Sequence, residues 1–281
     1  TLCSNMDVEI KDSSYVDFGN ITKLEIFWGD GNSTIDNNPG QMPNGSFYTH
    51  RYANFGTPAF KTFTIQMHAY SGIVCVDVRS KTITVNASPE ILFNPIPDIC
   101  NESIPVNITA SEIWGLAGIG TYSGLGITNP ALGTFNPSLV TPGNYPITYS
   151  FITNFGCRAD SIRLITVNPT PQASFTKAHG CLPNAGIQFT STSTVSGGNV
   201  NALNHLWNFG DPLAGPGNPN TSNAINPLHV YHSLNTFDVQ LQTTSSKGCV
   251  HDTIIKLYPD IDIFPQPDAN FKIDSLKLIC A

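Results

Sequence analysis

Cysteine spacing divides this chain into three units with the same internal order, and this feature restricts its fold more than any other. Seven cysteines occur among 281 residues. Three of them precede an alternating apolar-polar segment: Cys3, Cys100 and Cys181. Three others follow one: Cys75, Cys157 and Cys249. In each case an aromatic residue opens that segment twelve residues before the cysteine: Phe63, Tyr145 and Phe237. Units of about 80–95 residues with these signals have the size of a seven-stranded sandwich.

Short alternating segments indicate that the units are built from β-strands. Examples are VEIKDS, FTIQMHA, YPITYSF and FDVQLQT, and such segments end at Gly, Pro or Asn. Alternation at period two places one face of a strand in a core and the other in solvent. Helix signals are nearly absent. The sequence therefore predicts an all-β protein.

Proline-rich segments separate the predicted domains. We expect β-sandwiches over residues 1–87, 88–168 and 169–260. The connecting segments NASPEILFNPIPD, VNPTPQA and PDIDIFPQPDA should be stiff spacers and poor strands, because proline cannot donate to a strand ladder. Stiff spacers between consecutive sandwiches predict an elongated array.

A repeated phrase near the end predicts a further domain. PTPQASF at 169–175 recurs as PQPDANF at 265–271. We therefore expect residues 261–281 to be a linker and the first strand of a truncated fourth repeat. Its apolar residues should pack against the end of the third unit or against the open first-strand edge of the first unit in a neighbouring molecule: Phe271, Leu276, Leu278 and Ile279.

The repeat also predicts how the cysteines pair. Each unit holds one early and one late cysteine, so we expect the disulfides Cys3–Cys75, Cys100–Cys157 and Cys181–Cys249, with Cys280 as the single free thiol. Each loop would stabilise its domain by roughly 4 kcal/mol in the chain-entropy model. Disulfides imply an oxidising compartment. The alternative is a set of free, buried thiols.

Two aromatic-Gly-Asp stretches occupy equivalent places in the first and third units. The first is Ile26-Phe27-Trp28-Gly29-Asp30-Gly31, followed by His50-Arg51-Tyr52. The second is Trp207-Asn208-Phe209-Gly210-Asp211-Pro212, followed by His229-Val230-Tyr231. This order resembles the polycystic-kidney-disease (PKD) domain, an immunoglobulin-like sandwich of surface and secreted proteins. The first stretch departs from the family pattern by Ile26 in place of an aromatic residue, and the second by Pro212 in place of Gly.

Strand geometry assigns a structural role to these stretches. Trp207 and Phe209 lie two residues apart, as do Ile26 and Trp28, so each pair should face the core. Asp30 and Asp211 should accept N–H groups of the adjoining turn. The rival role for Asp30 and Asp211 is calcium binding, since the resemblance to the PKD family allows calcium as a cofactor. The sequence shows no dense loop of acidic residues of the kind that a calcium site needs.

The middle unit has a different pattern. It carries GIGTYSGLGI, LGTFNP and TPGNYPITYSF without the Gly-Asp and His-x-Tyr stretches. This resembles the immunoglobulin-like repeats found between PKD domains in very large surface proteins of gliding bacteria. The resemblance therefore implies the order PKD-type, Ig-like, PKD-type.

Composition and motifs exclude several classes of function. The net charge of −7 and the pI near 5.3 argue against a nucleic-acid partner. No apolar run reaches the roughly 18 residues that a bilayer span needs, and no signal peptide opens the chain, which we therefore expect to be an internal segment. No catalytic motif or zinc-ligand spacing occurs, and His229-x-x-His232 lies in a strand approach. We expect no enzyme activity and no tightly bound transition metal, with calcium left open.

Two classes of function remain. The first is a non-catalytic stalk or glycan-adhesion segment of a giant extracellular protein on a bacterial surface, similar to the gliding-motility adhesins. Its partners would be neighbouring repeats of the same chain and an extracellular surface or polysaccharide. The alternative is a run of spacer or carbohydrate-binding modules attached to a secreted polysaccharide hydrolase or protease.

Overall fold

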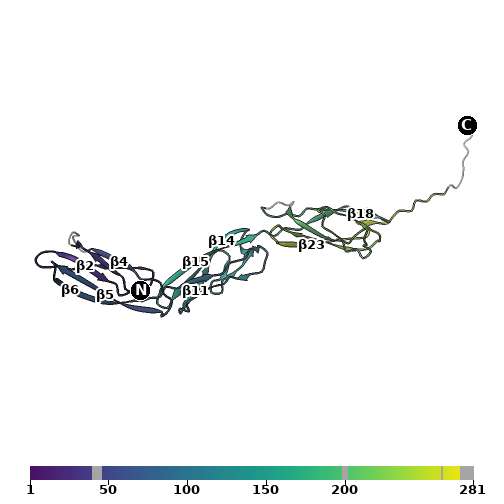
Figure 1. The fold of residues 1–281 in the computed structure, drawn as a ribbon. Helices are drawn as coiled ribbons and strands as arrows, with labels where there is room; N and C mark the ends of the chain where they lie inside the picture. The colour runs from purple at the N-terminus through teal and green to yellow at the C-terminus, as the bar shows by residue number, and fades with distance from the viewer. Residues whose placement is uncertain (40–45, 198–201, 261, 273–281) are drawn as a thin grey trace, which may run out of the picture. The chain divides into compact units, whose positions relative to one another are not determined.

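The computed structural model describes residues 1–39, 46–197, 202–260 and 262–272 (Figure 1). In this part of the chain the strands are joined by turns, one of them the short 3-10 helix η2 (Pro137–Leu139), and no α-helix occurs. The all-β prediction is therefore confirmed. The described residues also contain no helix with the length and hydropathy to cross a membrane.

The chain divides into two compact units, each described by itself below. The first consists of residues 1–97, 105–136 and 144–165, and the second of residues 98–104, 137–143 and 166–281. The division into three domains stays a prediction. We use "first repeat", "second repeat" and "third repeat" for residues 1–87, 88–168 and 169–264.

The strands of the first unit follow the predicted alternation. In chain order they are β1 (Asp7–Lys11), β2 (Ile21–Phe27), β3 (Ser33–Asp36), β4 (Phe47–Arg51), β5 (Phe60–Ser71), β6 (Cys75–Asn86), β7 (Ile91–Phe93), β9 (Val106–Asn107), β10 (Ala110–Glu112), β11 (Gly118–Ser123), β12 (Ile127–Asn129), β13 (Thr134–Phe135), most of β14 (Gly143–Thr153) and the start of β15 (Arg158–Asn168).

In the first repeat, a four-stranded sheet and a two-stranded sheet enclose one core. The sheets have the orders β3-β2-β5-β6 and β1-β4. β5 and β6 pair antiparallel along their whole length, from Phe60 opposite Asn86 to Ser71 opposite Cys75. The buried core residues come from both sheets: Val8, Leu24, Ile26, Trp28, Tyr48, Tyr52, Ile65 and Val85. Ile26 and Trp28 are fully buried, as their spacing predicts.

The segment NASPEILFNPIPD, which we expected to be a spacer before the second repeat, is part of the fold of that repeat. β7 pairs with β10, and Phe93 of β7 is buried with its ring against the rings of Tyr122 and Tyr149. The spacer interpretation is wrong here, because burial of the apolar residues stabilises this segment by more than its prolines cost in strand pairing. The other sheets of this repeat have the orders β12-β13-β9 and β11-β14-β15-β8.

The second unit contains the third repeat and the segments around it. Its strands are β8 (Ile99–Cys100), the last residues of β15, β16 (Phe175–Lys177), β17 (Gly180–Cys181), β18 (Ala185–Ser191), β19 (Asn204–Asn208), β20 (Thr221–Ser222), β21 (Leu228–Tyr231), β22 (Phe237–Thr244), β23 (Val250–Leu257) and β24 (Ile263–Phe264).

The third repeat is an immunoglobulin-like β-sandwich. The sheet β16-β18-β21 faces the sheet β20-β19-β22-β23. Residues of both sheets form its core: Ala173, Phe175, Ala185, Ile187, Phe189, Trp207, Phe209, Tyr231, Phe237, Val239, Leu241, Leu257 and Ile263. The segment VNPTPQA is not a free spacer either, since Ala173 and the adjoining Phe175 are buried in this core.

The end of the third repeat lies beyond the expected boundary at residue 260. Ile263 is fully buried in the core, and β24 pairs parallel with β17. Residues 265–272 form no strand. Phe271 is 85% exposed and so does not pack against the end of the third repeat, because no later strand among the described residues covers it as Phe189 and Trp207 cover Phe175. Leu276, Leu278, Ile279 and Cys280 lie outside the described residues.

Candidate functional site

The two aromatic-Gly-Asp stretches form equivalent clusters that join the two sheets of a sandwich. In the first repeat, Asp30 follows β2 of one sheet, and His50 and Tyr52 come from β4 of the other and the residue after it. In the third repeat, Asp211 follows β19, whereas His229 and Tyr231 lie on β21. We call these sets of three side chains the Asp-His-Tyr clusters.

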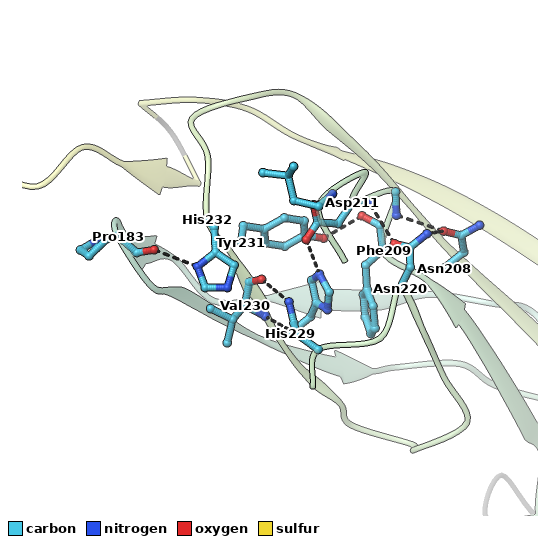
Figure 2. Close-up of polar contacts among 12 residues, drawn as sticks. Pro183, Asn208, Phe209, Asp211, Asn220, His229, Val230, Tyr231 and His232 are labelled. Carbon is cyan, nitrogen blue, oxygen red and sulfur yellow. Dashed lines mark hydrogen bonds and ion pairs between the residues drawn. The ribbon is translucent and has the colours of Figure 1, made fainter. Parts of the chain in front are cut away.

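Each cluster has the same two hydrogen bonds. The Nε2 atom of His50 lies 2.8 Å from Oδ2 of Asp30, and the Tyr52 hydroxyl donates to the carbonyl oxygen of Trp28 over 2.8 Å. Figure 2 shows the third-repeat cluster, in which Nε2 of His229 lies 3.0 Å from Oδ2 of Asp211. There the hydroxyl of Tyr231 donates to the carbonyl oxygen of Phe209 over 2.8 Å (Figure 2).

Aromatic contacts hold each histidine ring in place. His229 stacks on Phe209 with centroids 4.3 Å apart, and its edge faces Tyr231. The first repeat repeats this arrangement with His50 between Trp28 and Tyr52. A ring fixed on one face by stacking and at one nitrogen by a carboxylate is positioned to connect strands.

The aspartates also accept N–H groups of the turn, as predicted. The N–H of Asn32 donates to Oδ1 of Asp30 over 3.0 Å, and that of Leu213 donates to Oδ1 of Asp211 over 2.9 Å. The sequence interpretation missed the pairing of each aspartate with the histidine. The recurrence of His-x-Tyr at a similar distance after each Gly-Asp was the signal that could have revealed it.

A glycine before each aspartate allows the chain to turn against the next sheet strand. Gly29 has φ +83° and Gly210 has φ +64°, in the left-handed region. A Cβ atom would come within 2.7 Å of the carbonyl oxygen of Thr64 at the first site and within 2.4 Å of that of Asp238 at the second. Both backbone conformation and space therefore require glycine.

The two clusters differ in burial and in the pKa of their groups. The side chains of His229 and Asp211 are each 1% exposed, against 14% and 16% for His50 and Asp30. Burial lowers the pKa of His229, and the hydrogen bond with Asp211 offsets only part of that effect. Burial tends to raise the pKa of Asp30, but the hydrogen bonds from His50 and Asn32 outweigh it and hold that pKa below its usual range.

The tyrosines are held in their neutral form. Burial raises the pKa of Tyr52 to about 12, and it raises that of Tyr231 further. Both phenols act as hydrogen-bond donors to backbone carbonyls.

Both aspartates proposed as calcium candidates already have partners at each carboxylate oxygen. The described residues hold no group of three or more His, Cys, Asp or Glu side chains arranged to bind a metal. His232 turns away from His229, and its Nδ1 atom lies 3.1 Å from the carbonyl oxygen of Pro183 (Figure 2). The clusters are thus built to hold the two sheets together.

The cysteines pair differently from the prediction. Disulfides join Cys3 to Cys157 and Cys100 to Cys249, whereas Cys75 and Cys181 are free and exposed. The expected pairs Cys3–Cys75, Cys100–Cys157 and Cys181–Cys249 are therefore wrong. So is the expectation that Cys280 is the single free thiol.

Strand length gives the physical reason for this pairing. Cys3 forms a parallel bridge with Asn86, at the end of β6, whereas Cys75 begins that strand. Eleven residue steps along a strand span about 36 Å. The Cα atoms of a disulfide lie about 4.4–6.8 Å apart. The early and late cysteines of one repeat therefore cannot meet.

Each observed disulfide instead joins an early cysteine to the late cysteine of the following repeat. Within the first unit, Cys3 of the first repeat meets Cys157 of the second. Within the second unit, Cys100 of the second repeat meets Cys249 of the third. The sulfurs of the two late cysteines take equivalent positions, 3.9 Å from the carbonyl oxygen of Asn86 and 4.0 Å from that of Asn168.

Comparisons with known proteins give only slight likenesses. No family model matches the chain, and no curated protein matches it. Among solved structures, a Ca²⁺-stabilized adhesin of an Antarctic bacterium shares 12% identity, with 95% of this chain and 71% of that chain covered and a TM-score of 0.34.

Two further solved structures with slight likeness are a set of fibronectin(III)-like modules and a set of cadherin repeats. Fibronectin(III)-like modules of Clostridium thermocellum CbhA share 11% identity, with 65% of this chain and 100% of that chain covered and a TM-score of 0.31. Mouse cadherin-23 EC22-24 shares 12% identity, with coverages of 91% and 90% and a TM-score of 0.23. Likenesses of this size carry no argument about function, so the site has to be interpreted from its own geometry.

Proposed function

We propose that this chain is a non-catalytic stalk segment of a large extracellular adhesin, with three sandwich repeats in series. The observation that supports this most directly is that each disulfide joins two successive repeats. A bond at this place transmits tension from one repeat to the next, which a stalk requires and a flexible spacer does not.

Packing beside the first of these disulfides supports the same role. Phe155, in the hairpin that leads to Cys157, contacts Phe60 of the first repeat with ring centroids 6.0 Å apart. Ser88 of the second repeat also donates two hydrogen bonds to Ser4 of the first, from its N–H to the Ser4 hydroxyl over 2.9 Å and from its hydroxyl to the Ser4 carbonyl oxygen over 2.6 Å. The two repeats therefore share contacts beyond the covalent bond.

The Asp-His-Tyr clusters fit a load-bearing role as well. Each cluster connects the two sheets of a sandwich, because its aspartate lies at the turn after a core strand of one sheet and its histidine and tyrosine come from the other sheet. We infer that they resist separation of the sheets and take no part in chemistry. The finer assignment, to the gliding-motility adhesins of bacteria, rests on the motif resemblance alone.

Surface labelling of intact source cells tests the proposal. An antibody raised against this chain should label cells that have not been permeabilised. Labelling only after permeabilisation would contradict an extracellular stalk. Incubation of the chain with polysaccharide and protein substrates should release no product, and measurable turnover would contradict the non-catalytic role. Binding on a glycan array would add an adhesive role to the stalk role.

A further inference from the structure

Each repeat pairs the segment around its early cysteine with the end of its last strand, and the two segments run parallel. One such pair occurs in every repeat: Cys3 with Asn86, Cys100 with Asn168, and Cys181 with Phe264. The residue after each early cysteine donates its N–H to the carbonyl oxygen of the paired residue, over 2.8–3.0 Å. These donors are Ser4, Asn101 and Leu182. The same hydrogen bond therefore closes all three repeats.

The direction of these pairs determines how tension acts on them. Tension along the chain enters a repeat at its early-cysteine segment and leaves at the end of its last strand. Because the two segments are parallel, this tension pulls them past each other and loads their hydrogen bonds together. In an antiparallel pair the same two ends would lie on one side, and the bonds would break one at a time. We call the pair of β8 with the end of β15 the second clamp, and the pair of β17 with β24 the third clamp.

The second clamp is braced by side chains on both of its strands. Oδ1 of Asn101 accepts the N–H of Thr170 over 2.8 Å, which ties the residue after Cys100 to the chain beyond β15. Nδ2 of Asn168 donates to Oδ2 of Asp98, next to β8, over 3.3 Å. The second clamp therefore resists sliding with more than its backbone hydrogen bonds.

The third clamp is braced in a different way. The buried carboxylate of Asp262, directly before β24, forms an ion pair with Lys177 and accepts the N–H of Tyr258 over 2.9 Å. The N–H of Gly180 in β17 donates to the carbonyl oxygen of Asp262 over 3.0 Å. Separation of a buried ion pair leaves a charge without its partner, so these strands are costly to pull apart. Both clamps are thus reinforced beyond their strand pairing.

Cys100 of the second clamp also carries a disulfide, and this bond opens a second route for tension. Its partner Cys249 directly precedes β23, which leads to β24 at the third clamp. The sulfur of Cys249 lies 4.0 Å from the carbonyl oxygen of Asn168. The route through the disulfide and the route along the backbone therefore separate at the same place, the end of β15.

We propose that the Cys100–Cys249 disulfide makes the second and third clamps carry one load side by side. Tension that enters at Cys3 passes through its disulfide to Cys157 and along β15 to Asn168. From there one route crosses the second clamp, passes through the disulfide and follows β23. The other route follows the backbone into the third repeat and crosses the third clamp. Both routes end at β24, so the chain extends only when both clamps fail.

Without the Cys100–Cys249 disulfide, tension has a single route through the third repeat. The third clamp then carries the whole load, and the second clamp carries none. Two comparable clamps that share a load each carry half of it, so the disulfide should raise the force of the first unfolding event about twofold. This inference rests on the proposed stalk role for its purpose, because a shared load matters only to a chain under tension.

Pulling the whole chain by its two ends in a force spectrometer tests the proposal. The chain with both disulfides is compared with Cys100→Ser/Cys249→Ser, which keeps only the other disulfide. The first unfolding event should need about twofold more force in the chain with both disulfides. Cys75→Ser/Cys181→Ser is the matched control, since it removes two exposed thiols and should leave that force unchanged. Equal forces with and without the Cys100–Cys249 bond would overturn the proposal.

Substitution of Asn101 tests whether the second clamp carries the difference. Proline has no N–H, so Asn101→Pro removes the hydrogen bond that this residue donates, whereas Asn101→Ala keeps it. Asn101→Pro should lower the first unfolding force in the chain with both disulfides, and Asn101→Ala should lower it less. In Cys100→Ser/Cys249→Ser the second clamp carries no load, so Asn101→Pro should change nothing there. An equal loss in both backgrounds would show general destabilisation of the repeat and overturn the proposal.

The comparison of the two disulfide states stands even if Asn101→Pro fails to fold, because it leaves the second clamp unaltered. The force measurement is also independent of where the chain is located. A twofold difference without antibody labelling of intact cells would refute the stalk role and support the shared load. Labelling of intact cells with equal forces would do the reverse.

Discussion

Reduction of the two disulfides should increase the contour length over which force can extend the chain. The positions of the disulfides in the sequence determine the size of this increase. In the oxidised chain, held at its ends, tension passes from Cys3 directly to Cys157 and from Cys100 directly to Cys249. Between Cys3 and Cys249 only the segment from Cys100 to Cys157 then has to be extended. Full reduction adds about 190 residues, which at about 3.6 Å each add about 680 Å of contour length.

Single-molecule force spectroscopy with and without reductant measures this difference. Cys157→Ser should add about 40 residues, or about 140 Å, to the oxidised chain, since tension would then follow the backbone from Cys3 to Cys100. Cys75→Ser is the matched control and should add nothing. The reasoning fails if reductant leaves the contour length unchanged, or if Cys75→Ser adds the roughly 260 Å expected from a Cys3–Cys75 bond.

Four further predictions concern the clusters. Gly29→Ala should cost about 3 kcal/mol or more in unfolding free energy, whereas Gly31→Ala should cost only about 1 kcal/mol. Both glycines have a positive φ, but only at Gly29 would the added Cβ atom collide with backbone atoms of a neighbouring strand. Equal costs in urea titrations would contradict this prediction. Tyr231→Phe should cost about 1–3 kcal/mol by leaving a buried carbonyl unpaired, and an unchanged melting curve would contradict this. The lowered pKa of Asp30 stabilises the fold above about pH 4, so the stability difference between the chain and Asp30→Asn should shrink as pH falls below that value; a constant difference in denaturation at each pH would refute the assignment. Calcium should not shift the melting temperature, and a shift of several degrees that Asp30→Ala abolishes would replace the turn role with a metal site.

The fold could be predicted from sequence where local pattern decides it. Period-two alternation determined which side of a strand faces the core, so the burial of Ile26, Trp28, Trp207 and Phe209 followed directly. The role of Asp30 in its turn followed from local hydrogen-bonding chemistry in the same way.

The cysteine pairing could not be predicted because it depends on which end of a sandwich each residue occupies. Equal spacing from Phe63 and Phe237 established that Cys75 and Cys249 are equivalent, but not that they lie at the far end of a long strand from the early cysteines. The proline-rich lead-ins were misinterpreted for a related reason. Phe93 gains more from burial against Tyr122 and Tyr149 than the prolines lose in strand pairing.

Pairing across repeats imposes an order on biosynthesis. Because a chain is made from its N-terminus, Cys75 emerges before Cys157 and is available to Cys3 earlier than the partner that Cys3 has in the fold. Early folding of the β5–β6 hairpin carries Cys75 away along β6 and so protects Cys3 from the wrong partner. Each repeat thus has to fold before it is oxidised, and its covalent closure waits for the arrival of the next one.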